Sequence, residues 1–231
     1  MNMSSLLNQL LESAAGQAPT GSPGGNPDSA VGGSVSDFIS GRGGAALAGG
    51  ALGLLLGTKK GRKMGGKALK YGGVAALGVM AYKAYGNWQA QGGQMAPAAE
   101  PQTLDRVTGP VAEQHSTAVL KAIIAAAKSD GHVDERERQL IEEGMRSLTA
   151  EASVLQWVDR ELQKPLDPVE VASAADSIEV ASEMYLASAL VIDEGNFMER
   201  SYLEELGRQL KLAPELVTEL NDQAAAAQGA A

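Results

Sequence analysis

The chain has 231 residues, which is enough for one domain with a sizeable core or two small domains and excludes a large multidomain enzyme. It contains no cysteine, which excludes disulfide scaffolds, cysteine-ligated metal centres and thiol catalysis. The formal net charge is −9 at pH 7, so the average surface repels nucleic acid, and we expect no nucleic-acid partner.

Neither charge nor glycine is spread evenly along the chain. Residues 1–93 hold 22 of the 28 glycines. Residues 41–88 carry eight Lys and Arg and no Asp or Glu, which gives this segment a charge of +8 and leaves −17 for the remainder. The sequence therefore predicts two parts of opposite charge.

Residues 1–15 are predicted to form a short amphipathic helix. Four leucines have the spacing of a single apolar helical stripe, namely Leu6, Leu7, Leu10 and Leu11. A helix this short is either a fraying end of the chain or a docking element for a partner or a membrane surface. Residues 16–40 are rich in Gly, Pro and Ser and are predicted to form a flexible linker.

Residues 41–88 are predicted to form a membrane segment, because apolar stretches at 43–57 and 71–88 flank a basic run. Each stretch is short for a hydrocarbon core of about 30 Å. A four-residue glycine period favours close helix packing in a bilayer and self-association, and it comprises Gly49, Gly53, Gly57, Gly61 and Gly65. The basic residues expected at anionic headgroups are Lys59, Lys60, Arg62, Lys63 and Lys67. The alternative is a glycine-rich tether with a basic patch.

The topology of this segment stays open at the level of sequence. A hairpin with its basic loop in the cytoplasm would put both termini in the periplasm. A single span at 43–57 would instead leave the C-terminal part of the chain in the cytoplasm. No basic residue precedes Arg42, so we expect no cleaved signal peptide.

After a linker at 89–110, residues 111–224 are predicted to form an acidic all-helical domain, followed by a disordered tail at 225–231. Capping chemistry places seven helix starts, at or near Val111, Asp134, Thr149, Asp167, Ser177, Asn196 and Pro214. Three methionines are expected to fill the core, namely Met145, Met184 and Met198. His115 and His132 are expected to have no special role.

Two junctions between predicted helices, IAAAKSDGHVDERERQLI at 124–141 and ASALVIDEGNFMERSYL at 187–203, are similar to each other. The A-x-x-D-G-x-x-D-x-x-E pattern that starts at Ala127 resembles the TerB-like helical domain associated with tellurite resistance. From Leu6 to about Leu220 the chain is similar to YebE-type bacterial inner-membrane proteins of unknown function. The resemblance implies an all-α fold in which a glycine-zipper membrane segment precedes a TerB-like bundle of about seven helices. It also implies a cytoplasmic bundle and a link to envelope or metal stress.

Acidic residues at the two junctions form a candidate metal site. If the fold brings the junctions together, carboxylates would converge, and Ca²⁺ or Mg²⁺ would relieve their repulsion. The candidate ligands are Asp130, Asp134, Glu137, Asp193 and Glu199. Helix capping accounts for most of the same residues without a metal.

No catalytic constellation stands out in the sequence. A near match to a phosphate-binding loop at 61–67 is followed by Ala68 where Ser or Thr is required to hold Mg²⁺. We therefore expect a non-enzymatic, inner-membrane-associated protein, without a cofactor, whose acidic helical domain binds a protein partner. The alternative is a divalent-metal sensor tethered to the membrane.

Overall fold

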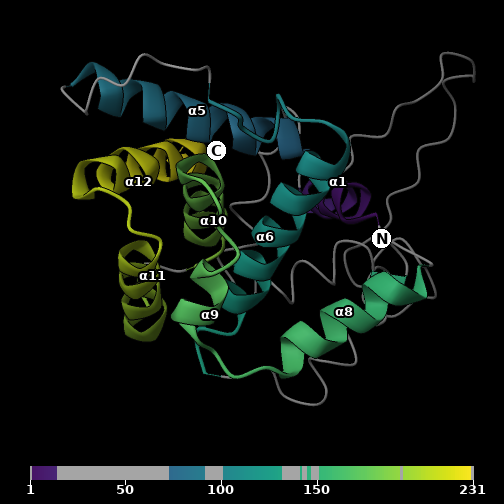
Figure 1. The fold of residues 1–231 in the computed structure, drawn as a ribbon. Helices are drawn as coiled ribbons and strands as arrows, with labels where there is room; N and C mark the ends of the chain where they lie inside the picture. The colour runs from purple at the N-terminus through teal and green to yellow at the C-terminus, as the bar shows by residue number, and fades with distance from the viewer. Residues whose placement is uncertain are drawn as a thin grey trace, which may run out of the picture.

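A computed structural model of the chain describes residues 2–14, 73–91, 101–131, 141, 145–146, 151–192 and 195–229 (Figure 1). All regular structure in these residues is helical, which confirms the predicted all-α class for this part of the chain. The helices are α1 (Met3–Ala14), α5 (Gly73–Ala90), α6 (Gly109–Ala127), α8 (Ala152–Gln163), α9 (Pro168–Ala172), α10 (Ile178–Val191), α11 (Phe197–Gln209) and α12 (Pro214–Gly229).

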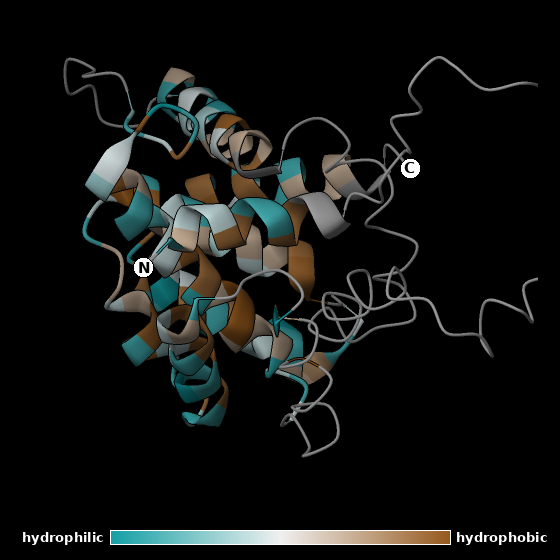
Figure 2. Cartoon of the chain, turned by 90° about the vertical axis from the view of Figure 1, so that its right-hand side faces the viewer, coloured by the Kyte–Doolittle hydropathy of each residue, from teal (hydrophilic) through white to brown (hydrophobic). Residues whose placement is uncertain are grey.

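Helices α6 and α10 form the centre of the bundle and make the most extensive contact between any two described helices. Ten consecutive residues of α10, from Val180 to Ala189, are buried, so neighbouring helices cover this helix on all sides. In Figure 1, α5 and α12 lie side by side across one end of this central pair, and α11 packs against α9. Residues of high hydropathy, drawn brown in Figure 2, lie mainly on the helix faces that point into the bundle, in agreement with the burial of the apolar residues.

Local capping chemistry predicts several helix starts correctly. The side chains of Asp167 and Asn196 each accept a hydrogen bond, of 2.9 Å, from the N–H group two residues ahead. The Ser177 hydroxyl accepts one of 3.2 Å from the N–H of Val180, and α12 begins at Pro214 as predicted. These four predicted starts are confirmed.

Other boundaries differ from the predicted ones. The first helix of the predicted domain begins at Gly109 instead of 111, and the helix predicted from Thr149 begins at Ala152. Helix α12 continues to Gly229, into the segment 225–231 that was predicted to be disordered. The start at Asp134 and the side chain of His132 lie outside the described residues.

Of the three methionines that were predicted to fill the core, two are buried and one is exposed. Met145 and Met184 are 1 % and 0 % exposed, which confirms their predicted core positions. Met198 is 54 % exposed and follows Phe197, which is 71 % exposed, so the prediction for Met198 is wrong. Both exposed residues lie in the first turn of α11.

The N-terminal helix and the second apolar stretch belong to the same bundle as the C-terminal helices. Helix α1 packs against α6 and α5, and α5 packs against α12 and α10. Leu77, Ala81 and Ala84 of α5 are at most 1 % exposed, so neighbouring helices cover this face of a stretch that was predicted to lie in the membrane. The prediction of a membrane segment at 71–88 is therefore not supported by α5.

None of the helices that the structure describes combines the length and the apolar character that a membrane crossing requires. The predicted glycine period and basic run lie outside the described residues. These positions are Gly49, Gly53, Gly57, Gly61, Gly65, Lys59, Lys60, Arg62, Lys63 and Lys67.

Gly78 of α5 lets the loop before α6 approach the helix closely. A Cβ atom at this position would lie 2.6 Å from the backbone nitrogen of Asp105 and also against its carboxylate, whereas a Cβ at Gly86 would meet nothing within 4 Å. We expect Gly78→Ala to lower the free energy of unfolding by about 1–3 kcal/mol. Gly86→Ala should raise it by up to about 1 kcal/mol.

Urea denaturation followed by far-UV circular dichroism measures both changes. Because the two substitutions share one helix and one chemistry, Gly86→Ala controls for helix propensity. Equal effects of the two substitutions would contradict the packing of this loop on α5.

Candidate functional site: the groove that holds the N-terminal helix

Helix α1 lies in a groove formed by α5 and α6, which includes Glu113 and Ser116 and which we call the α1 groove. Five apolar side chains of α1 are at most 9 % exposed, namely Met3, Leu6, Leu7, Leu10 and Leu11. Full burial stabilises a side chain of this size by about 1.5–3 kcal/mol. This burial offsets the entropy lost in ordering a helix that is too short to be stable alone.

Glu113 of α6 caps the N-terminus of α1 from another helix. Its Oε2 accepts a 2.8 Å hydrogen bond from the N–H of Met3, and its Oε1 accepts one of 3.2 Å from the N–H of Ser4. The first N–H groups of a helix have no partner within the helix, and a carboxylate also complements the positive end of the helix dipole. The Ser116 hydroxyl donates to the Ser4 hydroxyl at 3.0 Å. These polar contacts fix the register of α1 in the groove.

The charge of Glu113 is set by the same contacts. Burial acts to raise its pKa, but hydrogen bonds from the Ser4 hydroxyl and from the N–H groups of Met3 and Ser4 together hold the pKa below its ordinary value. The stabilisation by this carboxylate is therefore present above the ordinary Glu pKa and is lost as the pH falls through the lowered pKa. At neutral pH the cap is charged.

A buried polar pair joins α6 to α10 beside the groove. Nδ1 of His115 lies 2.9 Å from Oε2 of Glu183, and Oε1 of Glu183 accepts a hydrogen bond from the N–H of Leu104. Glu183 is 0 % exposed, and burial raises its pKa although His115 and Leu104 act to lower it. The expectation that His115 has no special role is wrong. The sequence signal that could have indicated a partner for His115 is Glu183, a carboxylate in the middle of the apolar helix α10.

The loop at residues 101–108 ties α5 to the central pair. The Thr103 hydroxyl donates to Asp105 at 2.6 Å, and the guanidinium of Arg106 lies 4.1 Å from the centre of the Tyr82 ring of α5. Together with the bond from Leu104 to Glu183, these contacts hold α5, α6 and α10 in one arrangement. That arrangement shapes the α1 groove.

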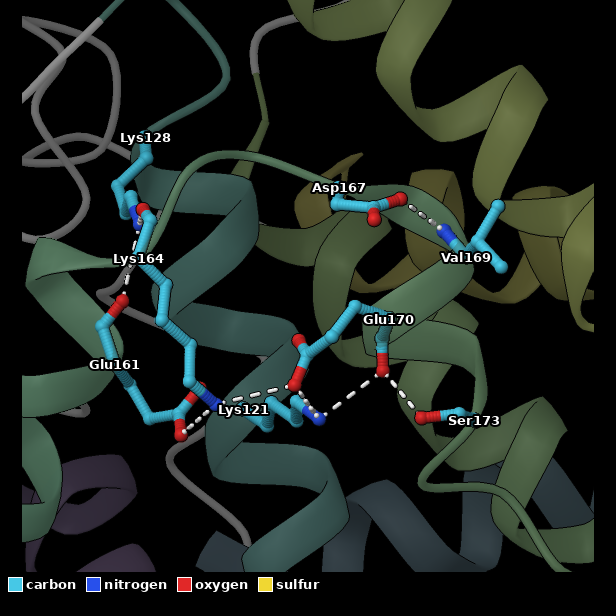
Figure 3. A network of polar contacts seen from close by, with 8 residues as sticks. All are labelled: Lys121, Lys128, Glu161, Lys164, Asp167, Val169, Glu170 and Ser173. Atoms are coloured by element: carbon cyan, nitrogen blue, oxygen red, sulfur yellow. Dashed lines mark hydrogen bonds and ion pairs between the residues drawn. The ribbon is translucent and has the colours of Figure 1, made fainter.

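A second polar cluster fills the seam between α6, α8 and α9 (Figure 3). Nζ of Lys128 donates to the backbone carbonyls of Glu161, at 3.0 Å, and of Lys164, and burial lowers the pKa of Lys128. Lys164 pairs with Glu161 at 2.6 Å, and Lys121 pairs with Glu170 at 2.8 Å. Cations at a helix C-terminus satisfy its free carbonyls. The cavity of about 10 Å³ beside this cluster has room for at most one water, so the cluster is best explained as a support of the fold.

Only two of the predicted metal ligands fall within the described residues. Asp130 is exposed after α6, whereas Glu199 is buried and accepts a 2.9 Å hydrogen bond from the side-chain amide of Asn196 at the start of α11. The described residues contain no group of three or more acidic or histidine side chains placed to hold a metal ion. The remaining ligands, outside the described residues, are Asp134, Glu137 and Asp193. Binding of Ca²⁺ or Mg²⁺ stays a prediction.

Comparison with known proteins finds a family for this chain. The model of a family described as "Protein of unknown function (DUF533)" matches residues 41–224. The "Uncharacterized protein in ampR 5'region" of Yersinia enterocolitica is 37% identical over 104 residues, which cover 45% of this chain and 75% of that protein. No solved structure matches the chain. The matched region includes most of the helical bundle, and the chain belongs to the DUF533 family.

Proposed function

We propose that the protein is a non-enzymatic protein associated with the bacterial inner membrane, and that its acidic helical bundle binds a protein partner. Residues 41–70 carry seven Lys and Arg and no acid, which favours contact with anionic headgroups. The resemblance to YebE-type and TerB-like proteins supports this location and a link to envelope or metal stress. A protein partner, rather than nucleic acid, suits the acidic remainder of the chain.

The observation that carries the proposed arrangement at the membrane is that the helices on both sides of the glycine-rich and basic segment pack in the same bundle. Helices α1 and α5 flank residues 15–72, contact each other and pack in one bundle. A single crossing of the bilayer would separate α1 from the bundle by about 30 Å of hydrocarbon and break these contacts. Two crossings require about 40 apolar residues, far more than the stretch 43–57 provides.

The segment is therefore proposed to touch the membrane from one side, with the bundle and α1 both on that side. This arrangement replaces the hairpin and the single span that the sequence left open. The cytoplasmic side is favoured, because the cytoplasmic leaflet carries anionic lipids that attract the basic residues of the segment.

The polar chemistry of the described residues supports a non-enzymatic role. The described histidine, His115, uses its Nδ1 to hold Glu183 in the bundle interior. Neither side chain lines the hollow beside α8 or the hollow between α9, α10 and α11. A packing role of the buried pair is consistent with this placement.

Cysteine labelling tests the arrangement cleanly because the native chain contains no cysteine. Gln9→Cys on α1 and Asp222→Cys on α12 replace exposed side chains at opposite ends of the chain. In bacterial spheroplasts, we expect a membrane-impermeant maleimide to leave both variants unlabelled and to label both after lysis.

Labelling of one variant alone in intact spheroplasts would contradict the one-sided arrangement. Labelling of both would contradict the cytoplasmic side. Recovery of the unmodified protein in the soluble fraction, after membranes are sedimented at physiological salt, would overturn the membrane association itself.

A further inference from the structure

Helix α5 differs in charge from the other helices that the structure describes. Each of the others contains at least one Asp or Glu, whereas α5 contains none. The helix belongs to a stretch without acidic residues that runs from residue 38 to residue 99. Acidic side chains are repelled by an anionic surface, so α5 is the described helix that such a surface repels least.

The face of α5 opposite its buried residues, which we call the α5 outer face, carries small and apolar side chains around one lysine. Val79 is 52 % exposed. The other exposed residues of this face follow at intervals of three or four, namely Ala75, Lys83, Gly86 and Ala90. That spacing places them on one side of the helix. The α5 outer face is therefore an apolar surface that the described part of the bundle leaves uncovered.

Two cationic side chains and a tyrosine border the apolar part of this face. Lys83 is exposed one turn after Val79, and Tyr82 beside it is half-buried. The guanidinium of Arg106 lies 4.1 Å from the centre of the Tyr82 ring and pairs with Asp105 at 3.7 Å. Long cationic side chains reach headgroups while their stems cover apolar surface, and tyrosine is enriched at the boundary between membrane and water.

The position of α5 in the chain brings this face close to the basic segment. Residues 41–70 carry seven Lys and Arg, and Lys70 precedes the first residue of α5 by three positions, which is at most about 11 Å of extended chain. At the other end of the helix, Asn87 and Gln91 donate hydrogen bonds of 3.0 and 2.7 Å to Glu219 of α12. The half of α5 that is nearest to the basic run is thus also the half farthest from this acidic neighbour.

We propose that the α5 outer face is the surface by which the bundle lies on an anionic membrane, with Val79 at the depth of the headgroups and Lys83 beside lipid phosphates. The helix lies along the membrane plane, because its opposite face packs against α10 and α12. Helix α9, at the other end of α10, then points away from the lipid (Figure 1). The proposal rests on the proposed membrane association and adds the face of the bundle that makes the contact.

A fluorophore on a single cysteine tests the contact in the full chain, because the native chain contains no cysteine. Val79→Cys on α5 and Val169→Cys on α9 are matched, since the two valines are 52 % and 57 % exposed. Each variant is labelled with nitrobenzoxadiazole, whose emission rises in apolar surroundings, and mixed with vesicles of phosphatidylglycerol and phosphatidylethanolamine. We expect a several-fold rise in emission at position 79 and little change at position 169. Vesicles of phosphatidylcholine alone should change neither.

Sedimentation of the same vesicles with the unlabelled chain separates the two possible failures. If the chain sediments with the vesicles and the label at position 79 responds no more than the label at 169, the α5 outer face does not make the contact. That result overturns this inference and leaves the proposed membrane association standing. If the chain stays in the supernatant, both proposals are overturned.

A pair of charged variants provides a second measurement that needs no label. Val79→Asp places a carboxylate on the α5 outer face and should weaken vesicle binding several-fold, because the anionic headgroups repel it. Val169→Asp adds the same charge on α9 and should leave binding unchanged. Far-UV circular dichroism shows whether both variants keep the helical fold. Equal binding by the two folded variants would contradict the inference.

Discussion

Replacing Glu183 with alanine is expected to lower the free energy of unfolding by about 3–5 kcal/mol. The substitution removes the oxygen that lies 2.9 Å from Nδ1 of His115 and the oxygen that accepts the N–H of Leu104. Both groups would stay buried without a partner, which is the costly outcome for polar groups in a core. Urea denaturation followed by far-UV circular dichroism measures the loss.

Two matched variants separate the polar contacts from the rest of the side chain. Glu183→Gln keeps the volume and one oxygen acceptor, and we expect it to cost about 1–2 kcal/mol. Glu179→Ala removes a partly exposed carboxylate from the first turn of the same helix and should change the stability by no more than about 1 kcal/mol. A loss in Glu183→Ala no larger than in Glu179→Ala would contradict the buried pair.

The stability difference between the native chain and Glu183→Ala is expected to change with pH in a defined direction. Burial raises the pKa of Glu183, and the neighbouring charge of Asp105 acts in the same direction, while His115 opposes them. The carboxyl therefore contributes most below the ordinary Glu pKa, and its contribution declines as the pH rises through the raised pKa. The stability gap between the native chain and Glu183→Ala should be larger at mildly acidic than at alkaline pH.

Replacing Leu7 with alanine is expected to lower the free energy of unfolding by about 2–5 kcal/mol. The Leu7 side chain is 0 % exposed at the centre of the buried face of α1, so its removal leaves a cavity in the α1 groove. Gln9→Ala, on the exposed face of the same helix, should change stability by no more than about 0.5 kcal/mol. Equal effects of the two substitutions would show that α1 does not dock.

A double variant measures the docking free energy of α1 itself. Residues 15–72 are the covalent connection between α1 and the other described helices, so α1 can detach while the rest of the bundle stays folded. Substitutions on α1 then cannot lower the free energy of unfolding by more than the docking free energy of α1. Leu6→Ala combined with Leu7→Ala should therefore cost less than the sum of the two single losses. Strict additivity would indicate that α1 unfolds only together with the whole bundle.

Features decided by neighbouring residues could be read from the sequence. The starts at Asp167, Ser177 and Asn196 follow from a side chain and an N–H group two or three residues apart. The apolar stripe of residues 6–11 likewise predicted α1, because periodicity within two turns identifies a helix face.

Features that join distant parts of the chain could not be predicted in this way. Glu113 caps a helix 110 residues away, and His115 meets a carboxylate 68 residues away. The small residues of α5 suit a membrane helix and a bundle helix equally well, because close packing uses the same side chains in both. Sequence alone therefore could not show that 73–90 packs in the bundle, and it overlooked the contact of His115.

The sequence by itself determined the all-α class, the starts of four described helices and the apolar face of α1, since each depends on residues within one or two turns. Only the tertiary structure decided that α1 and α5 share one bundle with the helices from 109 to 229. The physical reason is that an apolar helix face is stabilised by any cover that excludes water. Whether lipid, a partner or the same chain provides that cover is settled by long-range packing.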